Sequence, residues 1–235
     1  MKTILAAAVI AAIGAGVPAS AQTGGPSLLS PSREAQLERW LGAGDLLFDH
    51  LFTGMPGNSS LDFHSAVDGK GPTFTLMQVS NAVGQTYLVG GYNPQSWSST
   101  DGWHVTVPDW QRTAFIFNMT EPAVYRQVLS DYILPSQGSR QTYNAPDHGP
   151  TFGAGPDIFV NDRLDTAFSW RVTYGDPAGQ GKSIFDGSVG GQFFHIDALQ
   201  LYAVSPIPEP ASAAMLAAGL ALVGTMARRR KRARA

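Results

Sequence analysis

The chain contains no cysteine among its 235 residues, and charged side chains make up only 14% of the composition. Without cysteine, a disulfide framework, a thiolate nucleophile and a cysteine-ligated zinc or iron–sulfur centre are excluded. The low charge argues against a disordered acidic or basic protein, since about a quarter of residues are charged in ordinary domains. The sequence also lacks a repeat of fixed period, a His-Glu-x-x-His motif and a Gly-x-Ser-x-Gly motif.

Glycine and proline are abundant instead, with 26 and 16 residues. Both residue types favour turns and short strands over long helices. The length suits one globular domain with appendages at its ends. We therefore expect a mainly β (α+β) protein.

The N-terminus has the pattern of a secretory signal peptide. Lys2 supplies a positive start, residues 4–17 form a short apolar stretch, and Ala19 and Ala21 form a small-x-small cleavage site. The alternative is a buried N-terminal helix. The polar, turn-rich segment that follows residue 21 argues against that alternative, so we expect export.

The C-terminus carries a stiff motif, an uncharged run over 211–227 and a basic cluster, in that order. The residues that define the motif and the start of the cluster are Pro208, Glu209, Pro210, Arg228, Arg229 and Arg230. The run is at the short limit of a membrane-spanning helix, and a basic cluster after it favours a cytoplasmic end. The alternatives are a basic tail that binds nucleic acid and an amphipathic helix.

This order of features resembles the PEP-CTERM sorting signal of Gram-negative bacteria. The resemblance implies exosortase, a membrane cysteine enzyme that cuts near the motif, and the export machinery as partners. It implies an inner-membrane intermediate held by the C-terminal transmembrane helix, followed by the cell surface or the extracellular matrix. Exopolysaccharide or an envelope protein is then the expected contact there, and no cofactor is expected.

The body between the two terminal segments is acidic. Lys2 and the tail hold seven of the 16 Lys and Arg residues, and Glu209 is one of the 18 acidic residues. The remaining nine basic and 17 acidic side chains give a formal net charge of −8. Such a body is unsuited to nucleic acid, and it would be repelled by an anionic polysaccharide unless cations bridge the two.

The body begins with two helical patterns. Ser30 and Pro31 are typical of a helix start, and Gly42 of a helix end. A second short helix is predicted from Ser60, with Asp68 and Gly69 after its last turn.

Strand patterns follow. We expect Trp103, Val105 and Val107 to share the buried face of one strand, and residues 114–119 to form a central strand. Residues 124–134 suit either a short helix or irregular structure. The other expected strands cover 73–79, 86–89, 158–160, 169–174 and 194–201. Two packed sheets with helices at their margin, a β-sandwich, account for these elements.

Five stretches of the body follow one another in an order that is typical of one domain family. They are 63–73, 89–97, 113–117, 149–158 and 194–202. On these stretches the body resembles the TLDc domain family over about residues 28–204. The resemblance implies a two-sheet β-sandwich flanked by short helices. Gln200 departs from the family pattern, in which glutamate is common. Eukaryotic members are tied to oxidation resistance and to the vacuolar proton pump, a cytosolic partner that an exported protein would not meet.

The predicted organisation therefore has four parts. They are a signal peptide over 1–21, a linker over 22–27, a TLDc-like domain over 28–204 and a sorting signal over 205–235.

Two pairs of side chains form a candidate ligand face. His64 and Asp68 are four residues apart and would share a helix face, and a His–carboxylate pair can act as a base or bind a metal. His195 and Asp197 alternate on one face of a strand. The alternatives are a histidine that supports the helix end and a solvated strand face. No third metal ligand and no catalytic set is identifiable, so we assign neither.

Other motifs carry weaker signals. The glycine-rich segment 149–155 lacks the lysine or helix start that a phosphate site needs, so its glycines are expected to serve backbone turns and close strand approach. Asp157, Asp162 and Asp165 suggest at most a weak calcium site. The aromatic residues Tyr92, Trp97, Trp103 and Trp110 suit either core packing or stacking on sugar rings.

The sequence thus favours an exported, non-enzymatic module that binds protein or glycan at the cell surface or in the matrix. A secreted hydrolase or an enzyme that protects against oxidative stress is the first alternative. A calcium-dependent adhesive module is the second.

Overall fold

The computed structural model describes residues 26–129, 135–189 and 191–207 of the chain. The expected signal peptide, the Pro-Glu-Pro motif, the apolar run and the basic cluster lie outside these ranges. Within them, no helix is both long enough and apolar enough to cross a membrane.

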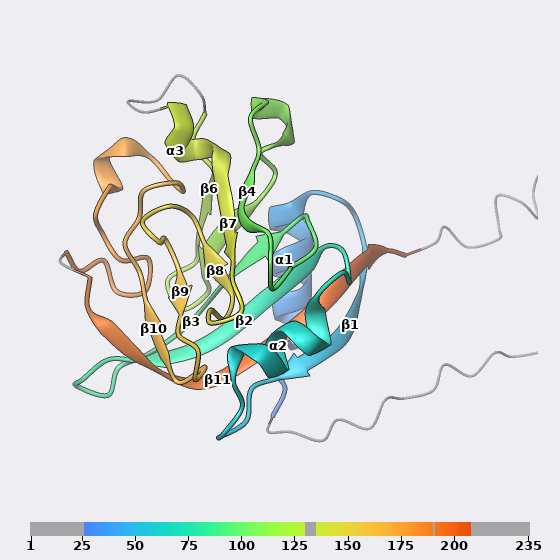
Figure 1. Ribbon diagram of the computed structural model, residues 1–235, viewed down its shortest axis with the longest axis vertical. Helices are drawn as coiled ribbons and strands as arrows, with labels where there is room; N and C mark the ends of the chain where they lie inside the picture. Colours follow the sequence, from blue (N-terminus) through green and yellow to red (C-terminus); the bar gives the residue numbers. More distant parts are fainter. Residues whose placement is uncertain (1–25, 130–134, 190, 208–235) are drawn as a thin grey trace, which may run out of the picture.

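The described part is mainly β, as expected, and its strands form two antiparallel sheets of unequal size (Figure 1). The large sheet has the strand order β6 (Ala123–Arg126), β5 (Phe115–Asn118), β3 (Thr86–Asn93), β2 (Thr73–Ser80), β11 (Phe193–Pro206), β10 (Thr166–Phe168) and β9 (Phe159–Val160). An eighth strand, β1 (Leu46–Thr53), also pairs with β11. The small sheet consists of β4 (Gly102–Val105), β7 (Arg140–Asn144) and β8 (Thr151–Phe152).

The two sheets are joined at one point rather than simply stacked. The large sheet curls, and an isolated antiparallel bridge between Phe152 and Ile158 links β8 to the segment that leads into β9. Figure 1 shows β4, β7, β8, β9 and β10 following one another across the molecule. The strands therefore form a nearly continuous wall around the core.

The helices are short. They are α1 (Pro31–Leu41), α2 (Ser60–Val67) and α3 (Pro135–Ser139), with single 3₁₀ turns η1 (Asp109–Gln111) and η2 (Pro177–Gly179). The helix α1 ends as predicted at Gly42, whose φ of 73° favours glycine. The N-cap of α2 is Ser59 rather than Ser60, because Ser59 and Asp62 form a capping box.

Two apolar clusters lie on the two faces of the large sheet. Met77 and Val79 of β2 point into the cluster shared with the small sheet, whereas Phe74 and Leu76 point into the cluster that also contains Leu37 of α1. Side chains alternate along a strand, so β2 is buried on both faces. The predicted central strand is confirmed as well, since every residue of β5 is buried.

One predicted strand has the opposite face buried. Val105 and Val107 are 49% and 69% exposed, and Thr106 between them is buried. The register of β4 against β7 shifts between His104 and Val105, and such a bulge moves the following side chains to the other face. The first part of the ambiguous segment 124–134 is strand β6, and residues 130–134 lie outside the described ranges.

The segment 169–174, expected to be a strand, instead wraps around a buried carboxylate. Asp157 Oδ1 accepts hydrogen bonds from the backbone N–H groups of Val172, Thr173 and Tyr174, each at 2.8 Å. The Ser169 hydroxyl donates to the Asp157 carbonyl oxygen at 2.7 Å. Three consecutive amides that point at one oxygen cannot also alternate between neighbouring strands, which is why the alternating sequence pattern misled the prediction.

The glycine-rich segment serves the backbone, as its composition predicted. Gly153 has a φ of 73°, and a Cβ atom there would lie 1.9 Å from Asp157 Oδ2. At Gly155 a Cβ atom would lie 2.0 Å from the Trp170 carbonyl oxygen. Both positions therefore need glycine for the turn around Asp157 to close.

Replacing Asp157 with alanine should strongly destabilise the fold. Three amide donors, two of them buried and one partly buried, would lose their acceptor, and each unsatisfied buried donor costs about 1–3 kcal/mol. We expect a loss of at least about 3 kcal/mol in the free energy of unfolding, measured by urea denaturation. Asp49→Ala, at an exposed position of β1, is the control and should stay within about 0.5 kcal/mol. Equal effects of the two variants would contradict this account.

Candidate functional site

The first predicted pair, His64 and Asp68, lies at the end of α2 and forms a contact. His64 Nδ1 lies 2.7 Å from Asp68 Oδ1. His64 Nε2 lies 2.9 Å from the Ala145 carbonyl oxygen and 3.2 Å from that of His148. The second oxygen of Asp68 accepts the Ser99 N–H at 2.8 Å. The pair therefore ties α2 to two loops that are distant in sequence.

The His64 ring is only 4% exposed, and both of its nitrogens face oxygen acceptors. A ring nitrogen that carries a proton donates to the oxygen that it faces. A ring engaged on both sides has no nitrogen left for a ligand. His64 thus fits the structural alternative that the sequence left open.

Replacing His64 with phenylalanine keeps a buried ring but removes both ring nitrogens. We expect a loss of about 2 kcal/mol in the free energy of unfolding, because the contacts with Asp68 and with the carbonyl oxygens of the 145–148 loop are lost. His195→Phe is the matched control, since that side chain is 67% exposed and should change stability by less than about 0.5 kcal/mol. A stable His64→Phe variant would show that the pair does not hold the loops.

The second predicted pair, His195 and Asp197, lies on β11 where this strand changes its partner. Along one edge β11 pairs with β10 up to His195 and with β1 from Gln200 onward. Its register against β2 shifts between Ile196 and Ala198, which places a bulge at Asp197. Bulges commonly redirect side chains beside functional sites.

A cleft of about 540 Å³ opens at this bulge. The loop that follows β1 and the turn that precedes β10 form its walls, and residues 195–199 line it from β11. Its ionisable lining side chains are Arg163, Asp165, His195 and Asp197. The cleft is the polar recess that contains the second pair.

Local hydrogen bonds hold the carboxylates of the cleft in place. Asn161 and Thr166 donate to the Asp165 carboxylate at 2.7 and 2.9 Å, and these bonds lower the pKa of Asp165. Arg163 Nε lies 3.6 Å from Asp165 Oδ2, and His195 Nε2 lies 4.0 Å from Asp197 Oδ1. The Ser80 hydroxyl donates to the same Asp197 oxygen at 3.1 Å. The cleft therefore presents carboxylates, a guanidinium and an imidazole that are open to water.

The two predicted pairs do not share a site. His195 and Asp197 line the cleft, whereas His64 is enclosed by the loops around Ala145 and His148. No group of three histidine or acidic side chains within the described ranges is placed to hold a metal ion. Of the suggested calcium ligands, Asp157 binds backbone amides and Asp162 accepts the Ser60 hydroxyl at 2.5 Å.

The four aromatic residues divide between the core and the surface. Tyr92 and Trp97 are 8% and 1% exposed, and the Trp97 indole N–H donates to the Thr73 hydroxyl at 2.9 Å. Trp103 is half-buried, and Trp110 is 77% exposed. Core packing therefore explains the first two but not the last two.

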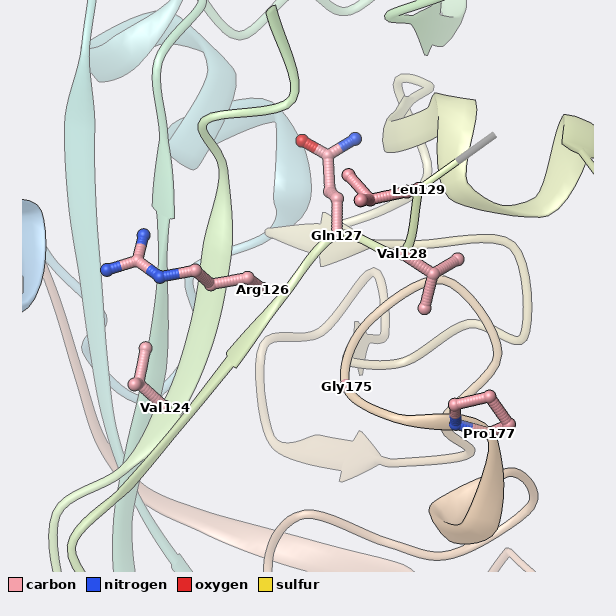
Figure 2. Close-up of a pocket in the computed structure, with 7 residues that line it drawn as sticks. All are labelled: Val124, Arg126, Gln127, Val128, Leu129, Gly175 and Pro177. Carbon is pink, nitrogen blue, oxygen red and sulfur yellow. The ribbon is translucent and has the colours of Figure 1, made fainter. Parts of the chain in front are cut away.

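A second hollow, which the sequence did not suggest, lies beside β6 (Figure 2). It has a volume of about 590 Å³. Its polar side chains are already engaged: Arg126 donates to the Trp40 carbonyl oxygen at 2.6 Å, and Gln127 donates to the Gly138 carbonyl oxygen at 2.9 Å. The rest of the lining is apolar or backbone, consisting of Val124, Val128, Leu129, Gly175 and Pro177.

The stability of the fold should depend on pH through Asp157. Burial raises its pKa from 3.8 to about 7, against the lowering effect of the backbone hydrogen bonds. A raised carboxyl pKa means that the folded state binds more protons than the unfolded state between these values. Stability from this group therefore falls as the pH rises from about 4 to about 7, by an amount on the order of 4 kcal/mol.

The measurement is the free energy of unfolding between pH 4 and pH 8 for the unmodified chain and for Asp157→Asn. The difference between them should change across pH 4–7 and level off above. Asp165→Asn is the control, because its lowered pKa keeps its contribution fully present above about pH 4, so its difference from the unmodified chain should stay constant from pH 4 to pH 8. Parallel curves for the unmodified chain and Asp157→Asn would refute the prediction.

Comparison with known families finds two matches, one in the body and one in the C-terminal segment. Residues 50–204 match the TLDc domain, and residues 206–231 match the PEP-CTERM protein-sorting motif. The chain belongs to the TLDc domain family. The motif marks it as an exosortase substrate and indicates exosortase-dependent export to the cell surface. A comparison with curated proteins finds no match.

Residues before the matched range belong to the same packed body. Leu28 and Leu29 are buried in the cluster under α1. Gln200, where the family pattern favours glutamate, is buried, and its Oε1 accepts the Leu28 N–H and the Tyr202 hydroxyl, both at 2.7 Å. In this chain the position therefore anchors the start of the body to β11.

Proposed function

We propose that this protein is sorted by exosortase to the cell surface or the exopolysaccharide matrix, where its TLDc domain acts as a non-enzymatic binding and structural module. The observation that carries the proposal is the PEP-CTERM motif directly after the body, at residues 206–231. The last described strand, β11, ends at Pro206, so the sorting motif begins where the folded wall ends.

The engagement of the buried polar groups supports a structural role for the domain interior. His64, Asp68 and Asp157 each bind backbone atoms of segments that are distant in sequence. The groups that remain open to water, such as His195 and Asp197, lie on the surface in an open cleft. A surface that offers polar groups on a rigid wall of strands suits binding.

The acidic body supports a location away from anionic surfaces. Residues 22–205 carry a formal net charge of −8, which favours solubility and disfavours adsorption to anionic lipid. Release from the membrane after cleavage near the motif is consistent with this charge.

The test follows the protein in cells that carry its exosortase. We expect the body in the envelope or the culture fluid, shortened at its C-terminus as judged by mass spectrometry. Replacing Pro208, Glu209 and Pro210 with alanine should abolish shortening and leave the chain in the inner-membrane fraction. Replacing the exposed residues Leu61 and Val83, which lie outside 206–231, with alanine is the control and should leave sorting intact. An intact, unmodified chain that is soluble in the cytoplasm would overturn the proposal.

A further inference from the structure

Six aromatic side chains form a row along the outer surface of the wall of strands. Neighbouring rings are in contact or stand on paired residues of adjacent strands. In order along the wall, the row consists of Trp103, Tyr143, His148, Phe159, Phe168 and Phe193. The name aromatic row is used below for these six residues.

The spacing within the row is regular. The ring centroids of Trp103 and Tyr143 are 4.8 Å apart, those of Tyr143 and His148 are 5.1 Å apart, and those of His148 and Phe159 are 5.2 Å apart. Phe159 then stands directly across from Phe168 in the pairing of β9 with β10. The row therefore passes from the small sheet onto the large one, and the step from Phe159 to Phe168 is a strand pairing, not a ring contact.

The far end of the row is its most exposed part. Phe168 stands across from Phe193 in the pairing of β10 with β11, with ring centroids 5.6 Å apart. Phe193 is 67% exposed, and the other five rings are half-buried. The inward neighbours Ala167 and Phe194 are buried, so alternation along the strands turns the row outward.

Single outward aromatic rings are common on soluble proteins, but a contiguous set of them marks an interaction surface. Neighbouring rings in the row are inclined to one another by 41° to 77°. They therefore offer a series of separate ring faces rather than one flat apolar plane. A polymer made of discrete rings can meet such faces one after another.

The charges beside the row favour an uncharged ligand. The Arg140 guanidinium lies over the Trp103 ring at 5.3 Å from its centroid, and the Asp147 carboxylate is paired with His148 Nδ1 at 2.7 Å. One cation and one anion therefore lie directly beside rings of the row. They supply hydrogen-bonding groups for hydroxyls next to the apolar ring faces.

We infer that the aromatic row binds a neutral polysaccharide chain, whose sugar rings stack on successive aromatic faces. The C–H face of a sugar ring is apolar and weakly positive, which complements the negative π face of an aromatic ring. Several weak stacking contacts along one chain add up to useful affinity. The inference rests on the proposed surface location and names the ligand class of the binding module.

Two other occupants fit the observations less well. An anionic membrane surface would repel a body with a net charge of −8, and the tilted rings form no flat face to lie on lipid. A second copy of the chain would bring two acidic bodies of like charge together. The neutral polysaccharide is the occupant that this charge does not oppose.

The test measures binding of the protein, as recovered from producing cells, to two soluble neutral polysaccharides, dextran and hydroxyethyl cellulose, by affinity electrophoresis. Trp103→Ala and Phe193→Ala should each weaken binding roughly tenfold, since each removes one of the ring faces on which a sugar stacks. Phe193 is the decisive position, because its ring is exposed and its replacement by alanine should leave the fold intact.

Trp110→Ala is the matched control. Trp110 is a more exposed ring near β4, and no ring contact within the described ranges joins it to the row. Its loss should leave affinity unchanged while thermal unfolding confirms that all three variants fold. Alginate serves as the anionic comparison and should bind more weakly than the neutral polymers.

Three results would overturn the inference. They are binding to neither neutral polymer, binding that Phe193→Ala leaves intact, and loss of binding that Trp110→Ala causes equally. Concentration-dependent dimerisation abolished by Phe193→Ala, or binding to phosphatidylcholine vesicles in its place, would reassign the row to the other occupants. None of these results bears on exosortase sorting, which the fractionation experiment tests separately.

Discussion

The wall of strands depends on one buried carboxylate. Asp157 gathers the backbone N–H groups of Val172, Thr173 and Tyr174 and so binds the segment before β9 to the segment after β10. Tyr174 in turn donates its hydroxyl to the Gln141 carbonyl oxygen at 2.7 Å, which reaches β7 of the small sheet. Asp157 and Tyr174 together thereby connect the two sheets near the point where Phe152 and Ile158 form their bridge.

The buried Asp157 carboxylate lies directly beneath the part of the wall that carries Phe159 and Phe168. Burial of Asp157 is unfavourable, as its raised pKa of about 7 reflects, and backbone amides offset part of that cost. Phe159 follows two residues later and faces outward on β9. The orientation of Phe159 and of its cross-strand partner Phe168 therefore follows from a contact made inside the molecule. The buried Asp157 contacts and the outward rings Phe159 and Phe168 therefore belong to the same short stretch of the wall, around β9 and β10.

Local patterns in the sequence predict the regular elements well. Helix α1 begins and ends at its predicted residues, and β2, β5 and β11 follow their apolar patterns. Prediction was wrong where a single long-range contact overrides the local period. A bulge after His104 reverses the buried face near Val105, and the carboxylate of Asp157 turns 169–174 away from a strand. The i, i+4 spacing of His64 and Asp68 predicts their contact, but no spacing shows that loops 145–148 enclose the ring. The aromatic row is also beyond local patterns, because its members come from five strands and a turn.

Native-state hydrogen exchange of the amides of Val172, Thr173 and Tyr174 tests the central role of Asp157 most directly. These three residues lie outside any strand, so their protection depends on the Asp157 carboxylate. We predict that they exchange as slowly as the amides of β2 and β11, and that Asp157→Ala, which removes the acceptor, speeds their exchange while β2 stays protected. Rapid exchange of all three in the unmodified chain, at the rate of exposed turns such as 81–84, would contradict the account.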